Sequence, residues 1–200
     1  MRALGAGTIA RLAAGMVVAS LLAACETAAP IPEYPEITFT NLPRIKLDVA
    51  RIEVRMDYKA PLKAPNVEHE FPVTPAAVAE RWAADRLEAV GSTGLARVIV
   101  KDASVVEVKL ERTKGLKGVF TKDQSERYDG KIEMVIEIRS ERGYRDAFAA
   151  AKATRSRSVP EDISLNDREK VWFEMTEAMI KDINAEFERT IPQYLSKWLR

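Results

Sequence analysis

The sequence is poor in the residues that most often carry chemistry. Its 200 residues include one cysteine, Cys25, and one histidine, His69. A single cysteine excludes an intramolecular disulfide, and general base catalysis near neutral pH most often uses histidine. His69 stands between Glu68 and Glu70, but a zinc site takes three or four converging ligands. We therefore interpret this segment as part of a solvated loop and expect no bound metal.

Sequence signatures of two enzyme classes are also missing. No serine is followed three positions later by lysine, as in penicillin-binding proteins, and no GxxxxGK[ST] phosphate-binding loop occurs. Two carboxylate pairs, Glu174 with Glu177 and Glu186 with Glu188, fall on a predicted amphipathic helix, where such residues usually form the solvated face. We expect no catalytic or cofactor-binding residues and a protein that is not an enzyme; a hydrolase using these carboxylates is an alternative.

No apolar run is long enough to cross a membrane as a helix. The run at residues 12–24 covers 13 residues, whereas a spanning helix needs about 20. Arg2 and Arg11 come before its apolar part, and no acidic residue occurs before Glu26, so we interpret residues 1–24 as a signal peptide. Without the two arginines, 31 basic residues fall to 29 against 30 acidic residues. This near-neutral balance does not indicate nucleic-acid binding.

The end of this segment, Leu22-Ala23-Ala24-Cys25, resembles the lipobox of bacterial lipoproteins, with a branched residue, two small residues and the acceptor cysteine. The resemblance implies a diacylglyceryl group on the Cys25 thiol, cleavage after Ala24, and acylation of the new amine, with palmitate as a typical chain. Two or three chains anchor firmly, since each buried methylene contributes roughly 0.8 kcal/mol. In such lipoproteins Glu26, in place of aspartate, implies the outer membrane, with the protein on its periplasmic face.

The chain after the lipobox divides into a tether and one domain. Residues 25–43 contain four prolines among small and polar residues, a composition that favours extended chain over regular structure. Residues 44–200 hold enough apolar material for one packed core, and their number suits one domain.

Alternation of apolar and charged residues with a period of two predicts four strands. They are expected at residues 45–58, 98–110, 128–140 and 144–159. In the first, the apolar phase changes at Ala50-Arg51, which indicates a bulge. In the last, the alanine-rich residues 147–153 favour helix by propensity, but the turn sequence at residues 140–143 favours a hairpin. We predict a strand whose alanines allow a helix to lie close.

Two helices are predicted around these strands. Thr74-Pro75 is a helix start, because the hydroxyl caps free amides and proline loses no hydrogen bond at the first position. Ser164 and Asp167 have the spacing of a capping box at the start of a second, longer helix. The stripes expected to face the sheet are Val78, Ala79, Trp82, Ala83, Leu87 and Val90 in the first helix, and Leu165, Trp172, Met175, Met179, Ile183, Phe187 and Ile191 in the second.

The predicted order is β-α-β-β-β-α, an α+β fold with an antiparallel-rich four-stranded sheet and two helices on one face. Over residues 45–191 this order resembles the auxiliary lipoproteins of lipid-transporting ABC systems and, more broadly, small lipoproteins of envelope assembly. The resemblance implies a non-enzymatic adaptor or accessory subunit of a lipid-transport or envelope-assembly complex. The alternative is a module of the envelope that binds lipid or glycan in an apolar groove.

Two segments are candidate contact surfaces for a partner or a membrane. A basic, glycine-containing loop carries apolar residues at its tip, and these features suit anionic lipid heads or a partner's groove; its candidate residues are Lys114, Leu116, Lys117, Val119 and Phe120. Pro192 is expected to kink or stop the last helix, which leaves Trp198 and Leu199 to dock on another protein or a membrane. For both segments we favour the alternative, in which the apolar residues pack on the domain's own core.

The predicted anchor depends on the thiol of Cys25. Replacing Cys25 by serine removes the acceptor atom, so we expect labelled fatty acid to enter the unaltered protein and not Cys25→Ser, and the variant to leave the membrane fraction. Thr27→Ser, two residues further along, is the matched control and should keep both label and membrane fractionation. A Cys25→Ser protein that stays in the membrane fraction would contradict the assignment.

Overall fold

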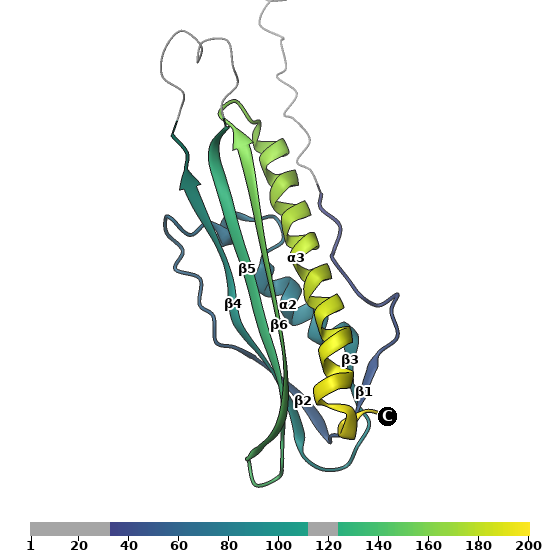
Figure 1. The fold of residues 1–200 in the computed structure, drawn as a ribbon. Coiled ribbons are helices and arrows are strands. Elements are labelled where there is room, and N and C mark those ends of the chain that lie inside the picture. The colour runs from purple at the N-terminus through teal and green to yellow at the C-terminus, as the bar shows by residue number, and fades with distance from the viewer. Residues whose placement is uncertain (1–32, 112–123) are drawn as a thin grey trace, which may run out of the picture. The chain divides into compact units, whose positions relative to one another are not determined.

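Two sheets and two α-helices make up the part of the chain that the computed structural model describes, residues 33–111 and 124–200 (Figure 1). Four strands form the main sheet in the order β2-β4-β5-β6, and β1 and β3 form a separate two-stranded parallel sheet. β2 and β4 pair in parallel, and the other two pairs are antiparallel. The elements are β1 Ile45–Leu47, β2 Arg51–Met56, the 3-10 helix η1 Glu68–Glu70, α2 Pro75–Arg86, β3 Leu87–Ala89, β4 Leu95–Lys109, β5 Gln124–Arg139, β6 Arg145–Pro160, α3 Leu165–Tyr194 and the 3-10 helix η2 Ser196–Trp198.

The predicted α+β class with a four-stranded sheet is confirmed. The alternating pattern of β5 turns one phase inward, where Ile132, Met134 and Ile136 are fully buried. A tight turn joins β5 to β6, with the Ser140 amide donating to the Tyr144 carbonyl at 3.0 Å. This turn fixes the hairpin register, so the alanine-rich segment forms strand β6, as predicted, although its intrinsic propensity favours helix.

α3 packs along the inner face of β5 and β6 (Figure 1). The side chains of β6 beneath it are small: Ala149, Ala151 and Ala153 are at most 5% exposed. On β5, a Cβ atom added to Gly130 would lie 2.4 Å from the Cε atom of Met175 on α3. Alanine and glycine therefore allow the helix and sheet to approach closely.

The predicted start of α3 is confirmed, but the first residue of the buried stripe predicted for this helix is wrong. The Ser164 hydroxyl accepts a hydrogen bond from the Asp167 amide at 3.1 Å, which caps the helix. Leu165 was predicted to face the sheet but is 66% exposed; it is the first residue of the helix. The helix continues two residues past Pro192 before it ends at Tyr194.

The predicted single strand at residues 45–58 with a bulge is wrong. The chain leaves one sheet after β1 and joins the other at β2, so the phase change at Ala50-Arg51 marks a break between strands. Other segments bind the backbone at this break: the Asp48 amide donates to the Trp198 carbonyl at 2.7 Å, and the Ala50 amide donates to the Thr93 carbonyl at 3.1 Å. These contacts come from distant sequence and leave no local pattern.

The first helix ends earlier than predicted. α2 begins as expected, with the Thr74 hydroxyl accepting from the Ala77 amide at 3.3 Å, but it ends at Arg86. The next three residues form β3 and pair with β1, beginning with Ile45 beside Leu87. Val90, predicted to belong to the buried stripe, is 42% exposed. Pairing with β1 therefore replaces the last turn of the predicted helix.

A bulge that the sequence did not indicate lies in β4. The register against β5 shifts between Val100 and Asp102, so the inward phase changes from even to odd positions. The fully buried inner residues of β4 are Ala96, Val98, Val100, Ala103 and Val105. Unbroken alternation from Val100 would turn Val106 and Val108 inward, but they pair with the outward residues Asp129 and Arg127 of β5.

Packing begins before residue 44, which corrects the predicted domain boundary. Residues 33–43 were assigned to the tether, but the compact unit starts at Glu33. Ile37 and Phe39 are 7% and 6% exposed, and the Phe39 amide donates to the Asp85 carboxylate at 2.9 Å. The prolines keep this segment extended, and its apolar side chains hold it on the domain.

The close approach of α3 to β6 can be tested with neighbouring alanines on opposite faces of the strand. Ala151 is 2% exposed beneath α3 and Ala150 is exposed on the other face. We expect Ala151→Leu to lower the free energy of unfolding by about 1 to 3 kcal/mol because it overpacks the interface. The matched control Ala150→Leu should change it by less than about 0.5 kcal/mol. Urea denaturation measures both, and equal losses would contradict this packing.

Candidate functional site

Several predicted site residues lie outside the residues that the structure describes. These are the signal cleavage residue Ala24, the lipidation residue Cys25, and the loop residues Lys114, Leu116, Lys117, Val119 and Phe120. Within residues 33–111 and 124–200, no helix has both the length and the apolar character needed to cross a bilayer.

The C-terminal candidates Trp198 and Leu199 pack on the domain itself. Both are partly buried against the core, and Leu199 forms an antiparallel bridge with Leu47. The Arg200 amide donates to the Lys46 carbonyl at 3.1 Å, and the Arg200 guanidinium pairs with the Asp48 carboxylate. This arrangement agrees with the alternative that we favoured, in which these residues cover the protein's own core.

The acidic residues beside the single histidine have different environments. Glu70 is exposed and its carboxylate lies 3.8 Å from the His69 ring nitrogen Nε2. Glu68 is only 2% exposed; its carboxylate accepts from the Tyr58 hydroxyl at 2.6 Å and from the Val105 amide at 3.0 Å. Among the described residues, no group of three or more histidine, cysteine, aspartate or glutamate side chains is arranged to hold a metal ion. The role of Glu68 is to attach the loop before α2 to β4.

Hydrogen bonds keep this buried carboxylate ionised. Burial by itself raises the pKa of Glu68, but the hydrogen bonds from Tyr58, Val105 and Asn66 outweigh burial and hold the pKa below its ordinary value. The same arrangement raises the pKa of Tyr58, through burial and its hydrogen bond to Glu68. The sequence does not distinguish the buried Glu68 from the exposed Glu70, because both glutamates flank the same histidine.

Most of the carboxylates considered as a catalytic acid or base form ion pairs with lysine or arginine side chains on α3. Glu174 lies 4.0 Å from Lys170, Glu177 lies 2.8 Å from Lys181, and Glu186 lies 2.5 Å from Arg189. These are solvent-facing pairs one helical turn apart. Their geometry supports the predicted solvated face and gives no support to a carboxylate hydrolase.

The fourth carboxylate, Glu188, takes part in a structural cluster with a buried arginine. Arg86 is 2% exposed; it donates to the Asn184 side-chain oxygen at 2.9 Å and to Glu188 at 2.8 Å, and it also reaches the Pro43 carbonyl. Trp82 donates to the same Asn184 oxygen at 3.0 Å. The cluster joins α2, α3 and the N-terminal segment, and it satisfies a charge that would be costly to bury without partners.

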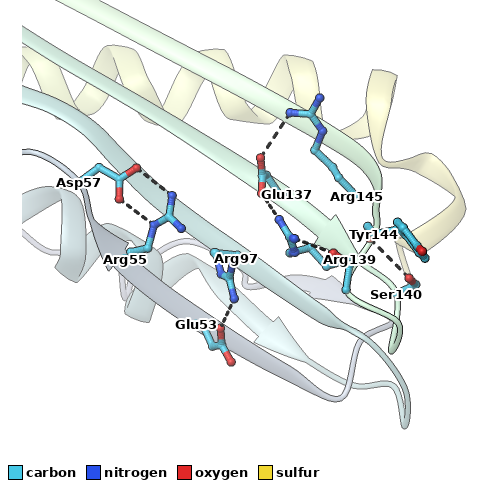
Figure 2. A network of polar contacts seen from close by, with 10 residues as sticks. Glu53, Arg55, Asp57, Arg97, Glu137, Arg139, Ser140, Tyr144 and Arg145 are labelled. Atoms are coloured by element: carbon cyan, nitrogen blue, oxygen red, sulfur yellow. Dashed lines mark hydrogen bonds and ion pairs between the residues drawn. The ribbon is translucent and has the colours of Figure 1, made fainter.

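The outer face of the main sheet, on the side opposite α3, carries an ordered array of charged side chains (Figure 2). We call it the outer sheet face and define it by two neighbouring cross-strand rows. One row is Glu53, Arg97, Glu137 and Phe148, and the other is Arg55, Ile99, Val135 and Ala150. Ile99 and Val135 are 3% and 6% exposed although no helix of the described residues covers them. Long charged side chains cover neighbouring apolar surface with their stems, and both residues have such neighbours on this face.

Ion pairs connect the strands across this face. Arg97 lies 3.0 Å from Glu53 on the neighbouring strand, while Arg139 and Arg145 lie 3.1 Å and 3.4 Å from opposite oxygens of Glu137 (Figure 2). Hydrogen bonds from Arg51 and Arg97 lower the pKa of Glu53. With Arg51 and Arg55, five arginines share three carboxylates, those of Glu53, Asp57 and Glu137. The excess positive charge favours an acidic surface as partner.

Two exposed aromatic residues border the outer sheet face at the β5–β6 turn. Tyr144 is 71% exposed and Phe148 is 49% exposed, with the Arg145 guanidinium 4.8 Å from the Phe148 ring centre. Arginine and aromatic side chains are enriched where proteins bind one another. Beside them, a hollow of about 540 Å³ is lined by the turn, residues 48–49, residues 93–94 and Trp198. Its lining carries both charge signs, so it selects no single class of small ligand.

The sequence contained part of this information. Alternation places Arg51, Glu53 and Arg55 on one phase, and Glu137 and Arg139 on one phase. Which of these residues lie beside one another depends on strand order and register, and the β4 bulge changes that register. The outer sheet face could therefore not be assembled from sequence.

Comparison with known proteins assigns no family to this chain. No family model matches it, and no curated protein matches it. Among solved structures, the crystal structure of protein XCC0632 from Xanthomonas campestris, described with the family model DUF330, shows 8% sequence identity and a TM-score of 0.30. That match covers 78% of this chain and 91% of the other. It is a weak structural similarity to a bacterial protein.

The buried carboxylate generates a prediction about stability and pH. We expect Glu68→Gln to lower the free energy of unfolding by about 1 to 3 kcal/mol at pH 7, because buried donors lose a charged acceptor. Since the pKa of Glu68 is lowered in the fold, its contribution is complete above the ordinary glutamate pKa of about 4.3. It is lost as the pH falls through the lower pKa of the folded state.

Urea denaturation between pH 7 and pH 3 measures this difference. The matched control is Glu70→Gln, two residues away, whose side chain is 54% exposed and whose replacement should change stability by less than about 0.5 kcal/mol. A difference between the unaltered protein and Glu68→Gln that stays constant down to pH 3 would show that ionisation of Glu68 is not what stabilises the loop.

Proposed function

We propose that this protein is a non-enzymatic lipoprotein of the bacterial cell envelope, an adaptor or accessory subunit that binds a lipid-transport or envelope-assembly complex. Lipid on Cys25 anchors it to a membrane, the outer membrane by the pattern of Glu26, and its domain works on the periplasmic side. The lipobox resemblance of Leu22-Ala23-Ala24-Cys25 supports the anchor.

The observation that carries the proposal is the one-sided construction of the main sheet. α3 and α2 both contribute buried residues to the core on the inner face, while the outer sheet face of the described residues has no covering element and carries ordered, paired charges. Fixed arginines and carboxylates with bordering aromatic residues suit recognition of another protein. An adaptor needs such a surface and needs no reactive group.

The ion pairs of this face favour a binding role over a purely stabilising one. Exposed pairs contribute little to stability because solvent screens them. In a complex, the same charges select a complementary partner and raise the rate of association. Arg55 and Arg51, with side chains 51% and 63% exposed, are accessible for this purpose.

The alternative, a module that binds lipid or glycan, has less support. The inner residues that face α2 and α3 fill the space between sheet and helices, as shown by the zero exposure of Trp82, Ile136 and Phe187. A hollow of about 410 Å³ lies between residues 34–37 and the start of α2, lined in part by Ile37 and Val73. It is a candidate groove for an apolar group, but Arg81 and Glu36 pair across it at 3.1 Å.

The adaptor function is tested by recovering the protein with its partner from gently solubilised membranes. We expect the tagged chain to be recovered with an integral envelope complex, and Arg51→Glu combined with Arg55→Glu to reduce the recovered partner at least ten-fold because the surface charge is reversed. The matched control reverses Lys170 and Lys181, two exposed lysines of α3, and should leave recovery unchanged.

Both double variants should unfold at the same urea concentration as the unaltered protein within error, since the replaced residues are exposed. Recovery of no partner in several mild detergents would contradict the adaptor function. Equal loss in the α3 control would show that general charge, and not the outer sheet face, holds the complex.

A further inference from the structure

The main sheet ends in a long strand with one neighbour. β6 has 16 residues, pairs with β5 on one side, and is the last strand of the sheet in the part of the chain that the structure describes. Its pairing with β5 is regular from Ala147 to Val159. Its only proline, Pro160, stands at its last position, so the backbone between residues 147 and 159 retains every amide donor. Such an edge is a template for a further strand.

The packing of α3 leaves this edge accessible. The helix lies over the inner face of β6, against Ala149, Ala151 and Ala153. Seven of the sixteen side chains of β6 are alanine or serine, which are too short to fold over the strand's own backbone. The helix therefore covers the inner face of β6, and among the described residues no segment other than β5 forms backbone hydrogen bonds with β6 between Ala147 and Val159.

The charge of the β6 side chains indicates which kind of strand can pair with its open edge. The segment from Ala147 to Pro160 contains Lys152, Arg155 and Arg157 and no acidic residue. Arg155 pairs with Asp182 of α3 at 2.5 Å. Among the ion pairs of the described residues, none includes Lys152 or Arg157, both of which are exposed.

A second copy of this chain is a poor occupant. Pairing two β6 strands with substantial overlap brings two sets of three basic side chains into one short stretch of ladder, and like charges near one another across a ladder are destabilising. Basic residues at an edge are a known protection against self-association. They do not protect against an acidic strand, which they attract.

We propose that the β6 edge binds an extended acidic segment of another protein by strand addition, enlarging the main sheet to five strands. Main-chain hydrogen bonds to β6 provide affinity, and side chains provide selectivity. Acidic residues of the incoming strand lie beside Lys152, Arg155 and Arg157, and an apolar residue lies beside Phe148 at the other end. The proposal deepens the adaptor function and rests on it, because it names the chemistry of the partner segment.

Binding of synthetic peptides to the full chain, purified from membranes in mild detergent, tests the proposal. The probe is a fluorescent ten-residue peptide with consecutive glutamates in one half, so that acidic side chains reach both faces of the added strand, and alternating valine and threonine in the other half, made in both sequence directions. We expect one direction to bind, measured by fluorescence anisotropy, and hydrogen exchange of β6 amides to slow when it binds. Lys152→Glu combined with Arg157→Glu should weaken binding at least ten-fold.

Two controls separate strand addition from simple charge attraction. The same peptide with N-methyl groups on alternate residues keeps its charge but loses half its amide donors and gains bulk on the ladder side, so its binding should fall at least ten-fold. Reversal of Lys170 and Lys181 on α3 should leave peptide binding unchanged. Equal binding of the methylated peptide, protection of amides only outside β6, or no binding by either direction would overturn the proposal.

Sedimentation of the chain without peptide completes the test. A monomer in its detergent micelle is expected, and a dimer whose β6 amides are protected would overturn the proposal in favour of self-pairing. This experiment uses no cellular partner and no residue of β2, so its failure is distinguishable from failure of the adaptor function, which is tested by complex recovery and by Arg51 and Arg55.

Discussion

The close packing of α3 on β6 is the contact on which the rest of the structure depends. It exists because β6 presents alanine at three successive inward positions, and because Gly130 on β5 leaves space for Met175 and Met179 of α3. A helix this near the sheet buries a wide stripe along its length, including Ile180 and Ile183, which are fully buried. Burial of this apolar surface is the main favourable term in the stability of the domain. Most apolar residues of the sheet lie on the inner side, and the outer side carries mostly polar and charged residues.

Two buried polar clusters then fix the relative positions of segments that apolar packing alone does not determine. Arg86 sets how α2, α3 and the chain before β1 lie together, since its guanidinium reaches all three. Glu68 attaches the long loop before α2 to β4 in the same way. Each buried charge has its partners, so removal of one partner costs more than the bond itself contributes. Both clusters connect segments that are distant in sequence, which is consistent with structural roles.

Sequence periodicity predicted the elements whose pattern is local. The strands β4 and β5, the capped start of α3 at Ser164 and the strand identity of the alanine-rich segment all follow from alternation, caps and turn residues. Two errors have a common cause. The break after β1 was read as a bulge, and the real bulge near Lys101 was not seen, because in both places distant backbone decides the geometry: Trp198 and Thr93 at the break, and the register of β5 at the bulge. The outer sheet face could not be predicted for the same reason, since its cross-strand rows depend on strand order and register.

The uncovered face and the uncovered edge share one physical origin. Alanines on the inner phase of β6 allow α3 to approach the inner face, and short residues on the outer phase, such as Ala150 and Ser156, add little bulk beside the edge. A protein that only needed stability would gain from covering that edge, because an open ladder invites association. Lysine and arginine on β6 limit such association to partners of opposite charge, and arginine on the outer sheet face has the same preference. In the function that we propose, two adjoining surfaces of one sheet both favour an acidic partner, and charge complementarity supplies the specificity of the adaptor.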